Sequence, residues 1–113
     1  MHEMSIVQSM LDIALKAGKD AGAKRVKEIR VMMSEYSDVV PVVMCEYFAV
    51  AAQGTMCEGA EIKITRIPVT MRCRECGWQG GVDKRRIRCG GCGGTSLSLI
   101  SGREFYVESL EAE

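Results

Sequence analysis

This sequence of 113 residues contains one histidine, His2, and lacks the motifs of several large enzyme classes. A serine or cysteine catalytic triad needs a histidine held inside the fold, so hydrolases of that kind are excluded. No Gly-x-x-x-x-Gly-Lys-Ser/Thr loop occurs, which excludes P-loop phosphate binding. We therefore do not expect an enzyme.

The chain also lacks net charge, with fifteen basic and fifteen acidic residues. A balance of this kind indicates that the chain as a whole is not built to bind nucleic acid. One local basic run is present, Lys84 to Arg88, but no aromatic residue interleaves it to stack on bases. A solvated loop is the favoured interpretation, and nucleic acid is not an expected partner.

Long apolar runs are missing as well. The N-terminus has neither the basic region nor the apolar stretch of a signal peptide, and no run is long enough to cross a bilayer. We expect a cytoplasmic protein, no membrane partner, and a reducing environment in which disulfides are disfavoured.

What the sequence does have is two closely spaced cysteine pairs. Cys73 and Cys76 form one Cys-x-x-Cys element, and Cys89 and Cys92 form another after twelve residues. This spacing is typical of a four-thiolate zinc site, in which the closed shell makes the metal structural. The alternatives are a disulfide pair or four buried thiols. Glycines that permit the tight turns of such a site lie beside the second cysteines: Gly77, Gly90, Gly91, Gly93 and Gly94.

The other two cysteines, Cys45 and Cys57, do not share this spacing. Cys45 lies within a predicted helix and Cys57 in a turn twelve residues later. We expect both to be reduced and to bind no metal.

Hydrophobic periodicity predicts an α/β fold. Helical spacing extends from about Glu3 to Ala17, and Gly18 and Gly22 mark the end of this first helix. A second helix is predicted from Pro41 to about Gln53. Its apolar stripe consists of Met44, Tyr47, Phe48, Ala51 and Ala52. Alternation typical of strands occurs around residues 28–33, 60–65, 97–100 and 104–107. The last strand can return to the first sheet, which would make the cysteine segment an insertion. The predicted domains are 1–68 completed by 103–113, and a zinc ribbon over 69–102.

His2 has a position that favours metal chelation. The amine of Met1, the amide of His2 and its imidazole can close two small rings, and Glu3 can add its amide or carboxylate. A nitrogen-rich square-planar set suits Ni(II) or Cu(II), and affinity order alone favours copper. A frayed terminal histidine is the alternative.

Several motifs together resemble the HypA/HybF family of hydrogenase maturation proteins. They are Met1-His2-Glu3-Met4-Ser5-Ile6 at the start, Ser37-Asp38-Val39-Val40-Pro41 before the second helix, Gly59-Ala60 at a strand, and the two cysteine pairs. The resemblance spans the chain and implies two helices on a small three-stranded sheet with an inserted four-cysteine zinc ribbon.

The same resemblance implies a nickel metallochaperone. It would deliver nickel to the large-subunit precursor of [NiFe] hydrogenase, in some organisms also toward urease, with a GTPase of the HypB family as partner. His2, with Glu3, would carry nickel, and the four cysteines would hold zinc. Some relatives have a further acidic nickel ligand before the second helix; here Glu35 and Asp38 are the nearest acids and position 40 is Val40, so that ligand stays open.

A second function class remains at this stage. The chain can instead be an adaptor that binds nucleic acid or protein through the basic residues between the cysteine pairs. Such an adaptor would bind in a salt-sensitive manner, whereas nickel delivery requires a free N-terminus.

Overall fold

The computed structural model describes residues 3–83, 85–102 and 105–113. Two helices and six strands follow one another in the order α1 (Glu3–Asp20), β1 (Val26–Ser34), α2 (Pro41–Ala51), β2 (Glu61–Ile67), β3 (Thr70–Cys73), β4 (Gln79–Gly81), β5 (Leu97–Ser101) and β6 (Phe105–Ala112). The residues Met1, His2, Lys84 and Glu104, for which the sequence predicts a role or a strand, lie outside the described residues.

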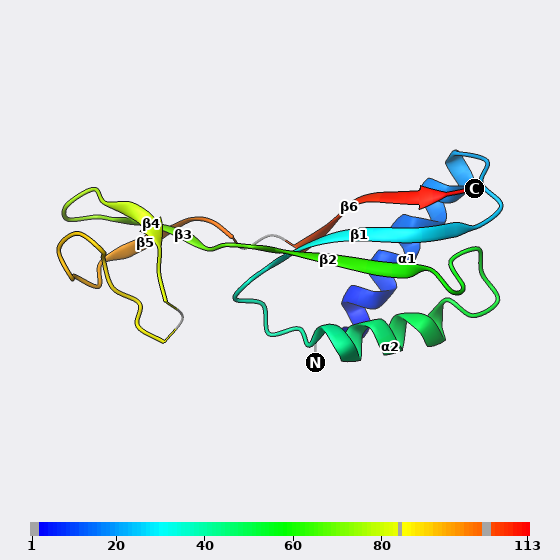
Figure 1. Ribbon diagram of the computed structural model, residues 1–113, viewed down its shortest axis with the longest axis horizontal. Helices are drawn as coiled ribbons and strands as arrows, with labels where there is room; N and C mark the ends of the chain where they lie inside the picture. The colour runs from blue at the N-terminus through cyan, green and yellow to red at the C-terminus, as the bar shows by residue number, and fades with distance from the viewer. Residues whose placement is uncertain (1–2, 84, 103–104) are drawn as a thin grey trace. The chain divides into compact units, whose positions relative to one another are not determined.

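β1, β2 and β6 form the first sheet, in the order β2-β1-β6 (Figure 1). Val26 N–H donates to the Met56 carbonyl at one end of β1, and Glu35 N–H donates to Ile67 at the other, so β1 and β2 run in parallel. The C-terminal residue Glu113 exchanges hydrogen bonds with Arg25, so β6 runs antiparallel to β1. This confirms that the last strand returns to the edge of the first sheet.

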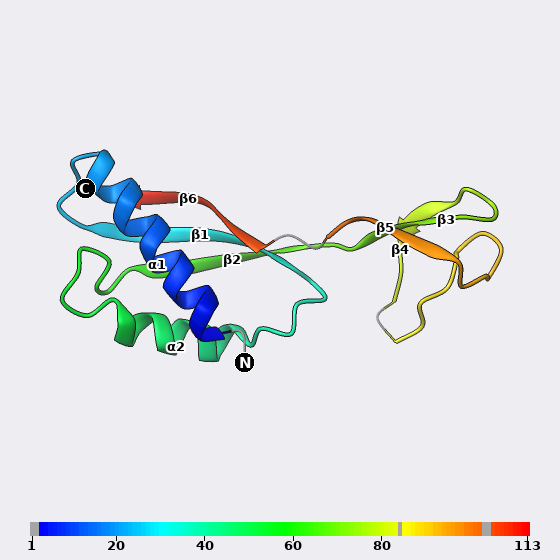
Figure 2. The ribbon, with the colours of Figure 1, turned by 180° about the vertical axis from the view of Figure 1, so that it is seen from behind.

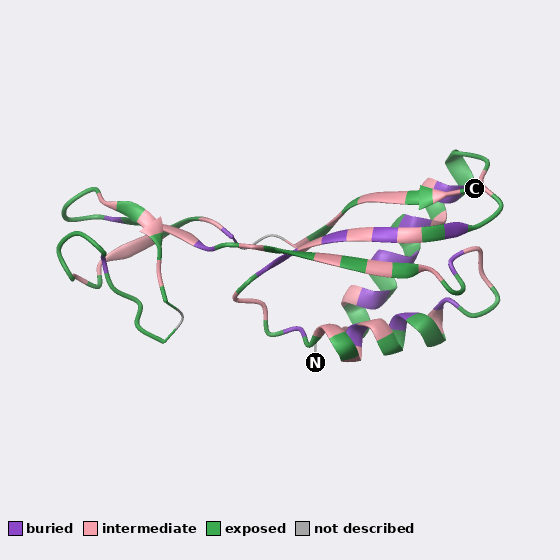
Figure 3. Ribbon diagram, in the orientation of Figure 1, coloured by how far each residue is buried: buried purple, intermediate pink, exposed green. Residues whose placement is uncertain are grey.

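α1 crosses one face of this sheet, as Figure 2 shows, and packs against α2. Its buried residues recur at helical spacing, Val7, Met10, Leu11, Ala14 and Gly18. Buried residues also alternate along β1 (Figure 3): Ile29, Val31 and Met33 each have no exposed surface. The predicted α/β class is therefore confirmed.

α1 continues through Gly18 and ends at Asp20, three residues beyond the predicted Ala17. A β-carbon at Gly18 would lie 2.5 Å from the sulfur of Met56, so this glycine allows close packing. Gly22, with φ of 67°, is the residue that ends the segment.

α2 begins at Pro41 as predicted but ends at Ala51, two residues early. Met44, Phe48 and Ala52 are buried, whereas Tyr47 from the predicted stripe is exposed. Periodicity does not distinguish the buried stripe of α2, because the helix is apolar around its circumference. Val42 and Val50 are exposed on its other side.

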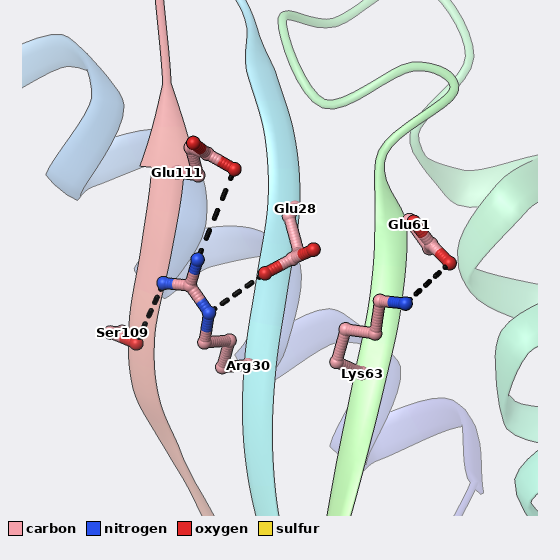
Figure 4. Close-up of polar contacts among 6 residues, drawn as sticks. All are labelled: Glu28, Arg30, Glu61, Lys63, Ser109 and Glu111. Atoms are coloured by element: carbon pink, nitrogen blue, oxygen red, sulfur yellow. Dashed lines mark hydrogen bonds and ion pairs between the residues drawn. The ribbon is translucent and has the colours of Figure 1, made fainter.

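The outer face of the first sheet is charged. Arg30 of β1 pairs with Glu28 at 2.7 Å and with Glu111 of β6 at 3.9 Å, and donates to Ser109 at 3.2 Å (Figure 4). Lys63 of β2 pairs with Glu61 at 3.0 Å, and this pairing raises the pKa of Lys63. These charged side chains make this the solvent-facing side of the sheet.

β3, β4 and β5 form the second sheet, in the order β4-β3-β5, and both pairs are antiparallel. β4 was not predicted, because three residues with two glycines carry no alternation. The chain divides into two compact units: the first comprises residues 1–32, 38–65 and 106–113, and the second comprises 33–37 and 66–105. Nothing in the sequence indicated that residues 33–37 group with the second unit.

Among the described residues, no helix is long and apolar enough to cross a membrane.

Candidate metal centres

The second sheet brings the two cysteine pairs together. Cys73 ends β3, and the other three cysteines lie in the turns that follow β3 and precede β5. The four sulfurs, from Cys73, Cys76, Cys89 and Cys92, all lie within 4.8 Å of one another.

The spacing of these sulfurs can be compared with a tetrahedral zinc site. A Zn–S bond of about 2.3 Å places sulfurs about 3.8 Å apart. Cys73 Sγ lies 3.7 Å from Cys92 Sγ, and Cys76 Sγ lies 3.4 Å from Cys89 Sγ. A disulfide needs about 2.05 Å, and none of the six cysteines forms one. The four residues therefore fit a tetrahedral thiolate-bound metal.

The two pairs form equivalent turns. Gly77 N–H donates to the Cys73 carbonyl at 3.1 Å, and Gly93 N–H donates to the Cys89 carbonyl at 3.0 Å. Both glycines have positive φ, 78° and 74°. Each therefore occupies the backbone conformation that side chains other than glycine rarely adopt.

Main-chain donors point at the sulfurs. Gly91 and Cys92 N–H donate to Cys89 Sγ at 3.2 and 3.3 Å. Burial raises the pKa of Cys89, but these N–H groups and the neighbouring thiols lower it more, to about 6. Gly94 N–H lowers the pKa of Cys92, but the sulfurs of the other three cysteines raise it more, to about 12. Four thiolates this close repel one another, so the fully ionised set requires a cation.

Trp78, the only tryptophan, connects the two turns. Its carbonyl accepts the N–H of Cys73 at 2.7 Å. Its indole lies against the backbone of the second turn, where a β-carbon at Gly90 would come within 2.5 Å of the ring. Gly90 is thus required by close packing and not by its φ angle.

Hydrogen bonds of Glu35 and Tyr36 connect residues 33–37 to the rest of the second unit. Glu35 Oε1 accepts the N–H of Val69 at 2.8 Å, and Glu35 N–H donates to Ile67 at 2.9 Å. The Tyr36 hydroxyl donates to the Val82 carbonyl. The Glu35 carboxylate, considered above as a nickel ligand, therefore has a structural partner.

Cys45 and Cys57 belong to the first unit, whereas the four-sulfur cluster belongs to the second. Cys57 is fully buried, and Cys45 is only half-buried on α2. Burial raises the pKa of both thiols, which keeps them protonated. Neither belongs to any metal-binding cluster formed by the described residues.

Glu3 is the one predicted nickel ligand among the described residues. It is the first residue of α1 and is half-buried. An acidic residue in the first turn is stabilised by the positive end of the helix dipole, so its position has a structural explanation as well.

Comparisons with known proteins cover the whole chain. The family model described as "Hydrogenase/urease nickel incorporation, metallochaperone, hypA" matches residues 1–112. The "Hydrogenase maturation factor HypA" of Dehalococcoides mccartyi is 35% identical over 115 residues, covering all of this chain and 95% of that protein. The factor of the same name from Moorella thermoacetica is 30% identical and is covered completely.

Solved structures share the fold. The solution structure of the Ni metallochaperone HypA from Helicobacter pylori matches with a TM-score of 0.70 at 22% identity, over 99% of this chain and 97% of that one. A second structure, titled "Solution structure of HypA protein", matches with a TM-score of 0.74, also at 22% identity, over 100% and 97%.

Proposed function

This chain belongs to the HypA family of nickel metallochaperones for hydrogenase and urease, and we propose that it binds its cargo Ni(II) through His2, with Glu3 and the amine of Met1. As a metallochaperone it delivers nickel during maturation and is not an enzyme. The observation that carries the proposal is the family match over residues 1–112, which includes this N-terminal segment.

The chemistry of the donors supports nickel at this position. An amine, a deprotonated amide and an imidazole form the nitrogen-rich set that Ni(II) prefers. His2 is the only histidine in the sequence, so no other residue can supply an imidazole.

The four-cysteine cluster serves the second metal. Cys73, Cys76, Cys89 and Cys92 hold Zn²⁺ in a closed shell, a role supported by their sulfur spacing of 3.4 and 3.7 Å. Zinc here is structural and leaves no open position for nickel. The chain works in the cytoplasm, with a HypB-family GTPase and the large-subunit precursor of [NiFe] hydrogenase as partners, or a urease precursor in place of the latter.

His2→Ala tests the nickel site. We expect it to abolish stoichiometric Ni(II) binding, because the imidazole is the only side chain in the chelate that cannot be replaced by a neighbour. Calorimetric titration of protein whose first residue is Met1 measures this, with zinc content and circular dichroism recorded in parallel. Nickel affinity should fall as the pH drops, because the imidazole and amide must release protons to bind.

A short tag before Met1 is the matched control. The tag removes the terminal amine and keeps the imidazole, so it should weaken nickel binding without abolishing it. Tight binding of one nickel by His2→Ala would refute the proposed site.

A further inference from the structure

β5 is an open edge of the second sheet, and its ladder with β3 has one register shift, which leaves Ile100 of β5 without a partner residue between Leu99 and Ser101. Leu97 to Leu99 lie in regular register with β3 and carry no charge or proline. In the part of the chain that the structure describes, β5 pairs only with β3. No charged residue or proline occurs between Cys89 and Gly102, and Leu99 and Ile100 are exposed. Edge strands usually carry charges, prolines or bulges that prevent pairing with another chain. The regular part of β5 is therefore available for an added strand.

Main-chain groups of β5 point to the open side. Arg74 N–H donates to the Ser96 carbonyl at 2.8 Å, and Met71 lies opposite Leu99 in the ladder. Since bonded and non-bonded pairs alternate in an antiparallel ladder, the N–H and C=O of Leu99 face away from β3. They can pair with an incoming strand.

One face of this edge is basic. Arg72 lies opposite Ser98, and Arg74 bonds to Ser96, so both arginines stand beside serines. Both arginines are exposed, and neither forms an ion pair among the described residues. A strand added to β5 would lie about 10 Å from β3, two strand spacings away. The Arg72 guanidinium donates from Nε and Nη2 to the side-chain oxygen of Gln79 on β4 at 3.1 Å, so it would have to rotate past the short Ser98 to reach an added strand.

The opposite face is apolar and hollow. Met71 and Leu99 share that face and line a cavity of about 370 Å³, together with Val69, Phe105 and the ring of Tyr36. Leu99 belongs to the open edge itself. An apolar side chain from an added strand can therefore enter the cavity.

We propose that β5 binds, by strand addition, an extended segment of another protein in which acidic and apolar residues alternate. Acidic side chains would face Arg72 and Arg74, and apolar side chains would face Leu99 and the cavity. In strand addition the main chain provides affinity and pockets for alternate side chains provide specificity.

The charge of the second unit favours an acidic partner over a second copy at this edge. Residues 33–37 and 66–105 contain eight lysines and arginines and four aspartates and glutamates. Pairing β5 with the β5 of a second copy would bring two basic units together. The inference does not depend on nickel, so the test uses nickel-free protein.

The test measures fluorescence anisotropy of a labelled synthetic peptide with full-length, zinc-loaded protein at physiological salt. The first peptide alternates glutamate and valine over nine residues; the second has the same composition in two blocks; the third alternates lysine and valine. We expect the first to bind, the second to bind about ten-fold more weakly, and the third not to bind. Amide resonances of Leu97 to Ser101 should shift with the first peptide only.

Charge-reversal variants identify the surface. Arg72→Glu with Arg74→Glu should weaken binding of the alternating peptide by about ten-fold or more. Arg85→Glu with Arg86→Glu, the same charge change at exposed residues between the cysteine pairs, should change it by about two-fold or less. Zinc content of each variant is measured to show that the site is intact.

Three results would overturn the proposal. Equal losses in the two double variants would indicate general electrostatic attraction, and equal binding of the block peptide would exclude a strand. Failure of the alternating peptide to bind, with concentration-dependent dimers that protect the β5 amides from exchange, would assign this edge to a second copy.

Discussion

Single glycines determine the shape of the cysteine turns. Gly77 and Gly93 occupy equivalent places, each one residue after the second cysteine of its pair, and both have positive φ. A residue with a β-carbon in this conformation costs about 1–2 kcal/mol. The sulfurs of each pair depend on this geometry to reach a common metal.

Gly93→Ala should therefore lower the apparent zinc affinity by about ten-fold, which corresponds to about 1.4 kcal/mol. Competition with a chromogenic chelator measures it. Gly81→Ala is the matched control, because a β-carbon there would meet only the Val69 carbonyl, at an ordinary 3.7 Å. If both variants lose zinc affinity equally, the backbone conformation of Gly93 is not what matters.

At the scale of elements, the segment that follows β1 is the least expected feature. Glu35 and Tyr36 lie far from the ribbon in sequence, yet their bonds to Val69 and Val82 attach them to the second unit. Burial, followed by the charges of Glu35 and Asp83, raises the pKa of Tyr36 from its ordinary value. Its hydroxyl thus remains a donor at neutral pH, and the stability that its hydrogen bond contributes is lost only as the pH rises through this raised pKa.

Glu35→Ala should leave the Val69 N–H without its partner and increase its amide exchange rate by about ten-fold to a hundred-fold, since a lost bond to a charged acceptor costs about 1.5–3 kcal/mol. Tyr36→Phe should increase the exchange rate of the Val69 amide less, because a neutral bond contributes about 1 kcal/mol. Amide exchange measured by NMR distinguishes the two variants. Tyr106→Phe serves as control because Tyr106 is exposed. Unchanged exchange at Val69 in Glu35→Ala would contradict this account.

At the scale of the whole molecule, the two units have very different cores. Most of the buried apolar residues belong to the first unit, including Met10, Ile29, Met44 and Phe48. Among the described residues of the second unit, the buried apolar side chains are Met33 and Val69 together with Cys73 and Cys89. So small a core does not offset the conformational entropy of folding.

Removal of zinc should therefore unfold residues 66–105 and leave the first unit folded. Structural zinc contributes on the order of 10 kcal/mol to modules of this kind. Hydrogen exchange after chelation should lose protection in β3 to β5 and keep it in α1 and β1. Trp78 should report the same change, with its emission shifting to longer wavelength as the indole leaves the second turn. Unchanged protection of β3 in Cys73→Ala would show that the metal does not hold this unit together.

The sequence by itself determined the α/β class, the positions of most helices and strands, and the cysteine pairs; that the last strand can return to the first sheet was only a possibility, which the bonds between Glu113 and Arg25 confirmed. These features depend on local patterns: alternation along β1, helical spacing along α1, and two cysteines three residues apart. Proline at the start of α2 likewise marked the beginning of a helix by its own backbone geometry, which does not depend on distant contacts.

Only the tertiary structure decided which residues are close in space. Gly18 leaves space for the sulfur of Met56, Gly90 leaves space for the indole of Trp78, and Glu35 accepts a hydrogen bond from Val69. The exposed edge of β5 likewise became visible only once its neighbour in the sheet was known. Such features depend on contacts between residues far apart in the chain, whereas composition and periodicity report only the conformation that each segment prefers locally.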